Sequence, residues 1–390
     1  MSSARGPGIL PWQDLKKAAR QGQLRSENYP IPAGSFQPAS VDLRLGERAY
    51  RLRCSFLPGS EPVSKRLEHF AMGDFDLRNG AVLESGRPYL IPLLEELALS
   101  KNLRGQTNPK SSTGRLDIFT RVITDAGTQF DEVAPGYHGQ LYLEVFSRTF
   151  TIKVKTGRSL NQLRLFASRD DCDDAGLLAL HSQHPLGYRG NRALGAESLL
   201  LSNGLLLGVD LGAGHAVGFR AKRNSHLLDL EATAAYEADD YWEEVYSESG
   251  SRLILEPEEF YLLLSKEAVC IPPTVAADMV AFDPTSGELR THYAGFFDPG
   301  FGYDPSGALK GSRAVMEVRA HDVPFAIEDG QRVAKLTFTR MAAEPTVLYG
   351  TPSIDSHYQG QGELRVLPKQ FLPPRTRQFQ PALRGSTRAR

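Results

Sequence analysis

The stretch LYLEVFSRTFTIKVKTGRSLNQLRLF, residues 141–166, decides the fold because it holds three short runs of β-forming residues separated by turns. Residues 141–146 and 150–154 are rich in β-branched and aromatic side chains. A turn follows at 155–157, and residues 160–166 continue the pattern. Strands this short, joined by turns, predict a β-sandwich or barrel.

Short strands are also predicted on the N-terminal side of this stretch. Residues 89–99 and 118–123 have the composition of strands, and an alternating strand begins within 37–46. Asp42 in that segment is interpreted as a paired polar group at the start of a strand. Residues 12–24 predict a short amphipathic helix. The 36 Gly and 25 Pro among 390 residues indicate many tight turns and again favour a mainly β fold.

The same order of features occurs a second time, at separations of 164 to 173 residues. The matched positions are Asp42 and Asp210, Ser100 and Ser265, Gly136 and Gly300, Glu144 and Glu317, and Gly157 and Gly330. Nearly constant separations over five landmarks indicate a tandem duplication, with an extra loop in the second copy at 303–312.

The duplication predicts the division of the chain. We expect a first domain over 1–175, a linker over 176–198, a second domain over 199–350 and a C-terminal tail over 351–390. The acidic stretch 231–248 is interpreted as a solvated segment. The end of the tail is basic and expected to be mobile, and a basic tail can also close over a bound polyphosphate. Its arginines are Arg375, Arg377, Arg384, Arg388 and Arg390.

The segment Lys110-Ser111-Ser112-Thr113-Gly114-Arg115 is the candidate binding motif. Hydroxyl groups, the backbone N–H groups near a Gly and a guanidinium fork together suit a polyphosphate. The alternative is a solvated surface turn, because Ser, Gly and Arg are common in loops.

The composition limits the classes of partner. The net charge of −1 gives no general attraction for nucleic acid or an anionic membrane, so an anion would need a local pocket. No apolar run has the length of a membrane span, and the N-terminus lacks the apolar core of a signal peptide. Three distant cysteines, Cys54, Cys172 and Cys270, make a disulfide framework improbable. We therefore expect a cytoplasmic protein.

The ordered motifs resemble the dCTP deaminase branch of the trimeric dUTPase fold. The resemblance rests on Ser111-Ser112-x-x-Arg115, on Pro-Gly-x-x-Gly at 135–139, on Leu143-Glu144 and on residues 157–166. It implies a tandem-duplicated bacterial form of that enzyme. The expected fold is mainly β, with two tandem dUTPase-like domains, each a distorted β-clip or jelly-roll-like barrel with short helices.

Two segments of the second copy strengthen the resemblance. Residues 293–301, Tyr-Ala-Gly-Phe-Phe-Asp-Pro-Gly-Phe, resemble the family hairpin more closely than the first copy does. His357-Tyr358-Gln359-Gly360-Gln361 resembles the C-terminal segment that folds over the triphosphate in the family.

The resemblance implies hydrolysis of dCTP to dUTP and ammonia, with Mg²⁺ bound to the triphosphate. No zinc is expected, since the sequence lacks the His-x-Glu and Cys-x-x-Cys signature of the unrelated zinc deaminases. The Glu after the hairpin, here Glu144 or its counterpart Glu317, would shuttle protons, with Ser111 and Arg115 orienting the reaction. The implied substrate-binding residues are Lys110, Ser111, Ser112, Arg115, Asp131, Tyr137, Asp298, Tyr358 and Gln361.

The two copies differ in the motifs that they retain. We place the second copy's counterpart of the Ser-Arg motif near 272–278, where no basic residue occurs and Asp278 would repel phosphate. The first copy has Ala134 where the family has an Asp, and Asp131 is the candidate replacement. We therefore favour the first copy as catalytic.

Under that preference Glu144 is the proton shuttle, and the mutation Glu144→Gln abolishes deamination while Glu317→Gln does not. In the alternative arrangement the two copies meet, so that the Ser-Arg motif faces Asp298 and Glu317. We also expect a homo-oligomer with threefold rings of domains.

Three other functions compete with the deaminase. A dUTP diphosphatase shares the fold and the phosphate motif, and the presence of Asp298 keeps a bifunctional deaminase–diphosphatase open. The second copy could also be a non-catalytic nucleotide sensor. A nucleic-acid binder is disfavoured by the neutral charge.

Overall fold

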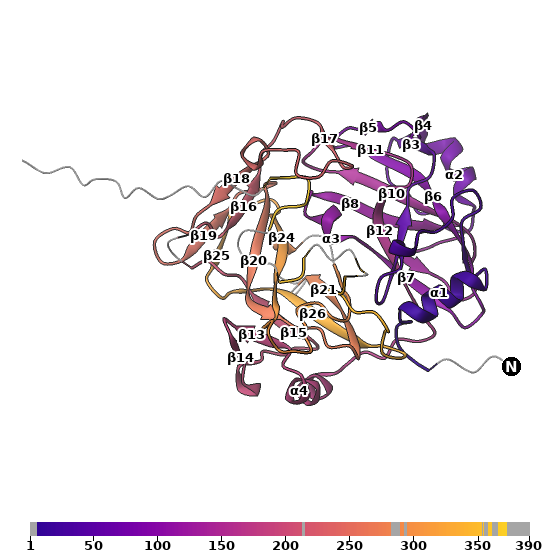
Figure 1. Cartoon of the computed structure of the whole chain (residues 1–390). Coiled ribbons are helices and arrows are strands. Elements are labelled where there is room, and N and C mark those ends of the chain that lie inside the picture. Colours follow the sequence, from indigo (N-terminus) through magenta and orange to yellow (C-terminus); the bar gives the residue numbers. More distant parts are fainter. Residues whose placement is uncertain are drawn as a thin grey trace, which may run out of the picture.

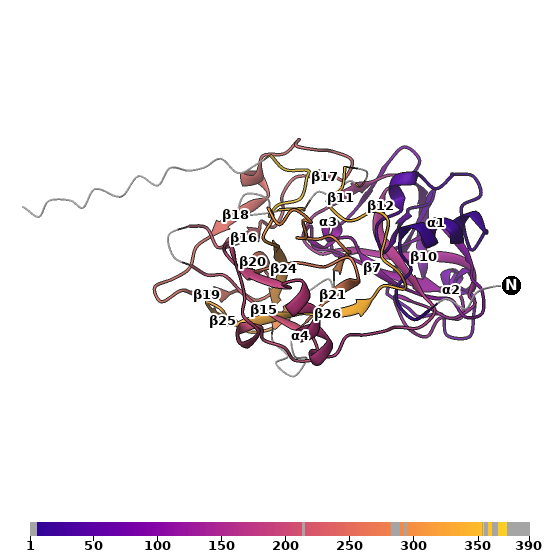
Figure 2. The ribbon, with the colours of Figure 1, turned by 60° about the horizontal axis from the view of Figure 1, so that its bottom comes forward.

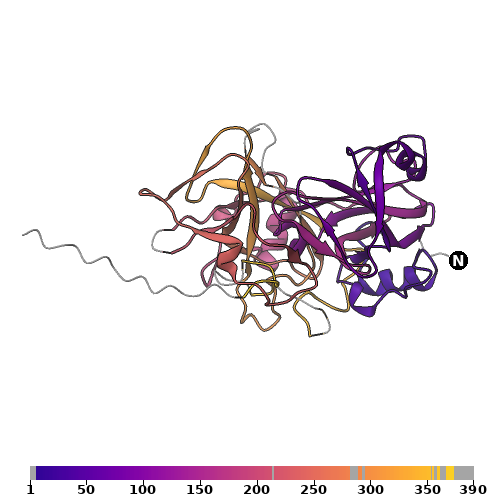
Figure 3. The ribbon, with the colours of Figure 1, turned by 90° about the horizontal axis from the view of Figure 1, so that it is seen from above.

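The computed structural model of the chain describes residues 6–212, 215–281, 289–291, 295–352, 354, 358–360 and 366–372. The chain forms two β-rich halves that lie side by side, and the C-terminal segment returns to the junction between them (Figures 1 and 2). The view from above shows the same lateral arrangement (Figure 3). The mainly β fold predicted from the sequence is confirmed.

The first half contains short helices and two main sheets. Its elements are α1 (Trp12–Arg20), β1 (Leu24–Arg25), η1 (Ala33–Ser35), β2 (Val41–Arg44), β3 (Arg48–Leu52), α2 (Val63–Phe70), β4 (Ala71–Asp76), β5 (Ala81–Leu83), β6 (Pro88–Ala98), β7 (Arg104–Pro109), α3 (Ser111–Gly114), β8 (Ile118–Thr124), β9 (Glu132–Val133), β10 (His138–Ser147), β11 (Ile152–Val154) and β12 (Ser159–Phe166). The predicted strands fall on β2, β6, β8, β10, β11 and β12, and the predicted amphipathic helix is α1.

The second half repeats this mixture of elements. It consists of α4 (Asp174–Gln183), β13 (Gly187–Arg189), β14 (Arg192–Ala193), η2 (Ala196–Ser198), β15 (Leu205–Gly208), β16 (Gly218–Ala221), β17 (Leu228–Asp229), η3 (Ala238–Asp240), β18 (Trp242–Val245), β19 (Arg252–Leu255), β20 (Phe260–Val269), β21 (Val275–Ala281), β22 (Leu289–Thr291), β23 (Phe296–Phe297), β24 (Ser312–Ala320), β25 (Phe325–Glu328) and β26 (Arg332–Arg340).

The sheets of the two halves have the same strand order. In the first half β4-β3-β6-β10-β8 forms one sheet and β2-β12-β7-β9 the other. In the second half the corresponding paths are β18-β16-β20-β24-β22 and β15-β26-β21-β23. The register agrees as well, because Glu144 lies opposite Leu90 and Glu317 lies opposite Leu262. Glu144 and Glu317 thus occupy equivalent positions in β10 and β24.

The register corrects the location predicted for the second Ser-Arg motif. Residues 275–281 form β21, which pairs with β26 as β7 pairs with β12. Pro109 therefore corresponds to Ala281, and the counterpart of Lys110–Arg115 falls on 282–287, outside the described residues. The prediction near 272–278 was wrong because similarity between copies is too weak there to fix an alignment without strand pairing.

The predicted linker carries regular structure. Residues 176–198 include most of α4 and all of β13, and β13 pairs with β20 as β1 pairs with β6. Asp173 caps α4, since its side chain accepts a hydrogen bond from the backbone N–H of Gly176. Helix α4 and β13 thus begin the second half as α1 and β1 begin the first.

Hydrophobic packing joins the two halves. The larger core cluster combines residues of β6, β8, β10 and β12 with Phe219, Trp242 and Phe260 of the second half. The rings of Phe150 and Trp242 have centroids 5.5 Å apart. The stretch 231–248, expected to be solvated, therefore includes buried aromatic residues, because the contact with the first half covers them.

Some predictions lie outside the described residues. This group contains hairpin residues 293–294, His357 and Gln361 of the C-terminal segment, and the basic end of the tail with its arginines. Within the described ranges, no helix is long and apolar enough to cross a bilayer.

Candidate functional site

The Ser-Arg motif forms a single helical turn at the junction of the halves. Strand β7 ends at Pro109, Lys110 is extended, and α3 follows. The N–H groups of Thr113 and Gly114 donate to the carbonyl of Lys110 at 2.8 and 3.0 Å, which closes the turn. This turn brings the side chains of Ser111, Ser112 and Arg115 to one cavity.

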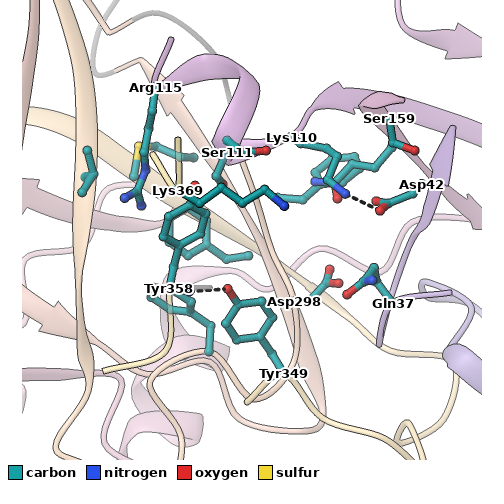
Figure 4. A pocket seen from close by; sticks show the side chains of 18 of the residues that line it. Gln37, Asp42, Lys110, Ser111, Arg115, Ser159, Asp298, Tyr349, Tyr358 and Lys369 are labelled. Atoms are coloured by element: carbon teal, nitrogen blue, oxygen red, sulfur yellow. Dashed lines mark hydrogen bonds and ion pairs between the residues drawn. The ribbon is translucent and has the colours of Figure 1, made fainter. Parts of the chain in front are cut away.

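The cavity has a volume of about 330 Å³ and takes its walls from both halves and from the C-terminal segment (Figure 4). Figure 4 shows Arg115 and Asp42 on opposite sides, with Lys110 and Ser111 between them. The principal lining residues are Gln37, Asp42, Lys110, Ser111, Ser112, Arg115, Arg158, Gln162, Glu231, Phe296, Phe297, Asp298, Glu317, Tyr349, Tyr358 and Lys369. The first-copy Ser-Arg motif therefore faces the second-copy hairpin, which is the alternative arrangement of the sequence analysis.

Glu317 presents a buried carboxyl group to this cavity. Strand β24 carries it directly against α3, where a Cβ atom on Gly114 would lie 2.6 and 2.7 Å from the two carboxyl oxygens. Burial raises the pKa of Glu317 well above its usual range; nearby Arg115 opposes the shift and Asp117 adds to it. A carboxyl group with a raised pKa can both accept and return a proton near neutral pH.

Arg115 is a buried cation on the same wall. Its guanidinium lies 3.8 Å from the ring centroid of Tyr358 and donates from Nη1 to the carbonyl of Val366 at 3.0 Å. Burial lowers the pKa of Arg115, with Tyr358 and Glu317 opposing that shift, but a guanidinium stays protonated in proteins. The C-terminal segment is thus attached to the Ser-Arg motif itself.

Asp298 of the hairpin is fixed by a residue of the first half. Arg164 of β12 donates from Nη2 to Asp298 Oδ1 at 2.9 Å and to the carbonyl of Phe297 at 3.1 Å. The same guanidinium pairs with Asp278 and stacks 3.9 Å from the ring centroid of Phe296. Asp278, expected to repel phosphate, instead takes part in an ion pair between the halves.

Lys110 and Asp42 form an ion pair on the opposite wall. Burial raises the pKa of Asp42, and Lys110 opposes that shift. Asp42 is paired, as predicted, but it also lines the cavity, which the sequence interpretation did not include. Arg158 and Lys369 add two further cationic side chains to the lining.

The C-terminal segment is held by hydrogen bonds to the hairpin loop. Gln359 accepts from the N–H of Gly302 at 3.0 Å and donates to the carbonyls of Gly300 and Tyr303. The hydroxyl of Tyr349 accepts from the N–H of Tyr358 at 3.2 Å. These contacts place Tyr358 over Arg115.

Glu144 does not belong to this cavity. Its carboxylate is buried within the first half and accepts from Nε of Arg121 at 3.1 Å. Arg121 also donates to the hydroxyl of Ser55 at 2.8 Å and stacks 3.7 Å from the ring centroid of Phe130. Glu144 is thus ion-paired with Arg121 away from the cavity, whereas the second copy places Glu317 against the Ser-Arg motif, an arrangement that favours Glu317 over Glu144 as the reacting group.

Asp131 and Tyr137 also lie away from the cavity. Asp131 accepts from the hydroxyl of Thr107 and the N–H of Val122, both at 2.8 Å, and burial raises its pKa to about 6. The Tyr137 hydroxyl donates to the carbonyl of Gln140 at 2.6 Å. Both residues stabilise the first half's own loops and do not line the pocket.

Several lining residues were missed by sequence reasoning. Tyr349 and Lys369 stand in segments without periodicity or a motif, and Arg158 and Gln37 lie in recognised segments in which they were not singled out; only the folded chain brings the four together. Asp42 opens a strand, but the expected pairing of Asp42 with Asp210 was wrong: Asp42 lies opposite Gln162 as Leu206 lies opposite Lys335, so its counterpart in the second copy is Leu206.

Within the described residues, no group of three or more His, Cys, Asp or Glu side chains is arranged to hold a metal ion. The hydroxyl and cationic groups of the cavity suit an anionic ligand better than a bare cation.

Comparisons with known proteins agree over both halves of the chain. A family model described as the 2′-deoxycytidine 5′-triphosphate deaminase N-terminal domain matches residues 6–169, and one described as the C-terminal domain matches residues 173–371. The chain is also similar to a solved structure titled 2′-deoxycytidine 5′-triphosphate deaminase from Agrobacterium tumefaciens. The TM-score is 0.81 at 42% identity, and the match covers 87% of this chain and 100% of that one.

Two curated relatives are shorter matches. A protein named dCTP deaminase from Natronomonas pharaonis is 31% identical over 156 residues, covering 39% of this chain and 74% of that protein. A protein named dCTP deaminase, dUMP-forming, from Parafrankia sp. is 29% identical over 202 residues, covering 47% of this chain and 87% of that protein.

Proposed function

This chain belongs to the 2′-deoxycytidine 5′-triphosphate deaminase family, and on that premise we propose that it converts dCTP to dUTP and ammonia at the cavity between its halves. The observation that carries the proposal is the buried carboxyl of Glu317 lying against Gly114, beside Arg115. It supplies the proton carrier that hydrolytic deamination requires.

Glu317 serves as both base and acid. Its carboxylate takes a proton from water as the water oxygen bonds to C4 of cytosine, and passes that proton to N3. It then takes the proton of the new C4 hydroxyl and gives it to the amine, so the C4–N bond breaks, ammonia leaves and the carbonyl forms. Each transfer returns Glu317 to the carboxylate form, so no other titrating group is needed.

The remaining lining residues bind and orient the nucleotide. Ser111, Ser112 and Arg115 offer hydroxyl and guanidinium donors suited to phosphate and to the attacking water. Lys369 and Tyr358 close the cavity from the C-terminal segment. We propose that magnesium binds with the triphosphate and that zinc takes no part.

The test is turnover of dCTP with Mg²⁺ by the full chain, with products separated by chromatography. We expect Glu317→Gln to lower kcat at least about 10³-fold, since both proton transfers use one carboxylate. Glu144→Gln, the matched control at the equivalent strand position, should keep kcat within about fivefold of the parent. Loss of activity in Glu144→Gln with activity kept in Glu317→Gln would contradict the assignment, and nucleotide binding without turnover would favour a sensor.

A second candidate is a dUMP-forming reaction, in which the diphosphate is also removed. The relative from Parafrankia sp. carries that description in its name. Asp298, the hairpin carboxylate that could activate water for it, has one oxygen paired with Arg164 and the other accepting from Ser40 at 3.4 Å. Both oxygens of Asp298 are thus engaged by protein donors, so we propose dUTP as the product; dUMP with pyrophosphate in the same assay would establish the alternative.

We further propose that the two halves arose by tandem duplication of one dUTPase-like domain, supported by the shared strand order. The cavity uses residues of a single chain, so each chain would carry one site of this kind. A homo-oligomer with threefold rings and a cytoplasmic location remain predictions.

A further inference from the structure

A second charged pair crosses the junction beside Glu317. Arg319, two residues further along β24, pairs with Asp117, two residues beyond Arg115. Residues two apart on a strand point to the same face, so Glu317 and Arg319 both face the first half. Arg115 lies near Glu317, and Asp117 is ion-paired with Arg319, so charges of opposite polarity stand on two adjacent rungs between the halves.

The second rung is buried and firmly held. The side chain of Asp117 is fully buried and that of Arg319 is 5% exposed. Asp117 also accepts from the hydroxyl of Thr149 at 2.6 Å, and its carbonyl accepts from the N–H of Arg148 at 3.0 Å. Its φ of 57° lies in the left-handed region that Asp tolerates better than most residues. The Asp117–Arg319 pair therefore holds two opposite charges at fixed positions near Glu317.

The equivalent position of the first half lacks this rung. By strand register Arg319 corresponds to Phe146 of β10, two residues beyond Glu144. The Asp117–Arg319 pair therefore lies beside Glu317, which faces the cavity. In the described part of the chain, no equivalent pair lies beside Glu144, which is bound to Arg121.

Among the described residues, the charged groups that act on Glu317 lie on the segment after α3. Arg115 and Asp117 face it from the segment after α3, and Tyr358 faces it from the C-terminal segment. Strand β20 places Leu262 opposite it, which carries no charge. With Glu317 ionised, the two rungs together are neutral, and protonation leaves one net positive charge.

We propose that the Asp117–Arg319 pair is a positioning device that sets the proton affinity of Glu317 and with it the pH range of the reaction. The proposal rests on the proposed role of Glu317. Asp117 disfavours the ionised carboxyl and Arg319 favours it, so removing either charge displaces the titration in a direction fixed by its sign.

The experiment compares kcat/KM for dCTP as a function of pH. The rate falls on the acid side as Glu317 becomes protonated. Asp117→Asn, which keeps the shape and an acceptor for Thr149, should move this acid limb to lower pH, and Arg319→Gln should move it to higher pH. A unit charge about 7 Å away at an effective dielectric constant of roughly 20 gives a displacement of about one to two pH units.

Two controls separate this effect from general damage. Arg148→Gln removes a cation whose partner, Glu258, is half exposed and also lies 3.7 Å from Arg319; an exposed charge is screened by solvent, so this variant should leave the limb in place. The double variant Asp117→Asn with Arg319→Gln should return the limb close to that of the parent. If Arg319→Gln does not fold, the comparison rests on the other two variants: the acid limb should move to lower pH in Asp117→Asn and stay in place in Arg148→Gln.

The proposal is overturned if the acid limb of the kcat/KM profile stays in place in Asp117→Asn and Arg319→Gln, or moves in the same direction in both. Either result leaves the deaminase assignment intact. Should the parent chain fail to deaminate dCTP, the proposed function fails. Infrared difference spectra against Glu317→Gln then report the carboxyl titration directly. If the infrared titration of Glu317 moves in opposite directions in Asp117→Asn and Arg319→Gln, the role of the pair is supported; an unchanged titration in both variants refutes it.

Discussion

Gly114→Ala is the sharpest test of the geometry at Glu317. A methyl group at this position would lie 2.6, 2.7 and 2.9 Å from three atoms of the Glu317 carboxyl, whereas ordinary contact begins at 3.4 Å. The nearest oxygen must therefore retreat by about 0.8 Å (3.4 minus 2.6). The obstructing atoms end a side chain, so the carboxyl can swing aside without unfolding β24.

The expected result is loss of rate with little loss of stability. Displacing a reacting group by about 1 Å can cost roughly 10²-fold in rate, so we expect kcat to fall about 10²-fold. Gly114 lies in helical backbone with no positive φ, where Ala is favoured over Gly by roughly 0.5–1 kcal/mol. That gain offsets part of the crowding, and the free energy of unfolding should stay within about 1 kcal/mol of the parent.

The assay pairs steady-state turnover of dCTP with urea unfolding. Gly34→Ala is the matched control, because Gly34 lines the same cavity but a Cβ there meets no atom within 4 Å. A kcat within threefold of the parent in Gly114→Ala would refute the close approach of Glu317 to α3. Equal losses in both variants would show that a methyl on the wall acts by blocking the nucleotide.

Two further substitutions test charges elsewhere in the structure. Arg164→Met leaves the buried carboxylates of Asp278 and Asp298 without their shared partner and should lower the free energy of unfolding by about 3 kcal/mol. We also expect KM for dCTP to rise, and Arg164→Lys to restore part of both losses. A urea unfolding curve unchanged from the parent would contradict this prediction. For Asp131, with a pKa raised to about 6, protonation favours the folded state, so stability is lost as pH rises through that value. From pH 5 to pH 8 the free energy of unfolding of the parent should fall by about 1.4 kcal/mol more than that of Asp131→Asn, as measured by urea unfolding at each pH. Parallel profiles of stability against pH would exclude the raised pKa of Asp131.

The sequence predicted the parts of the site more completely than their arrangement. Ser111, Ser112 and Arg115 were identified because hydroxyl and guanidinium groups within six residues have a local chemical meaning. Asp298 was found because a Pro-Gly turn marks the hairpin. Such signals depend on residues close together in the chain, and folding does not change them.

The choice between Glu144 and Glu317 could not be made in this way. Both follow a hairpin, and both are buried in equivalent strands. Arg121 pairs with Glu144 from the neighbouring strand β8, and that pairing follows from the register of β8 on β10. Strand register depends on contacts across the sheet, so a single sequence does not specify it reliably.

By itself, then, the sequence determined the mainly β architecture, the repeated order of landmarks and the chemistry of the Lys110–Arg115 motif, because these depend on local propensity and spacing. Only the tertiary structure decided that this motif meets Glu317 and not Glu144. Packing of the first half's core against Trp242 and Phe260 brings the halves together, and this puts α3 against β24. The site is a product of that junction, which neither half contains alone.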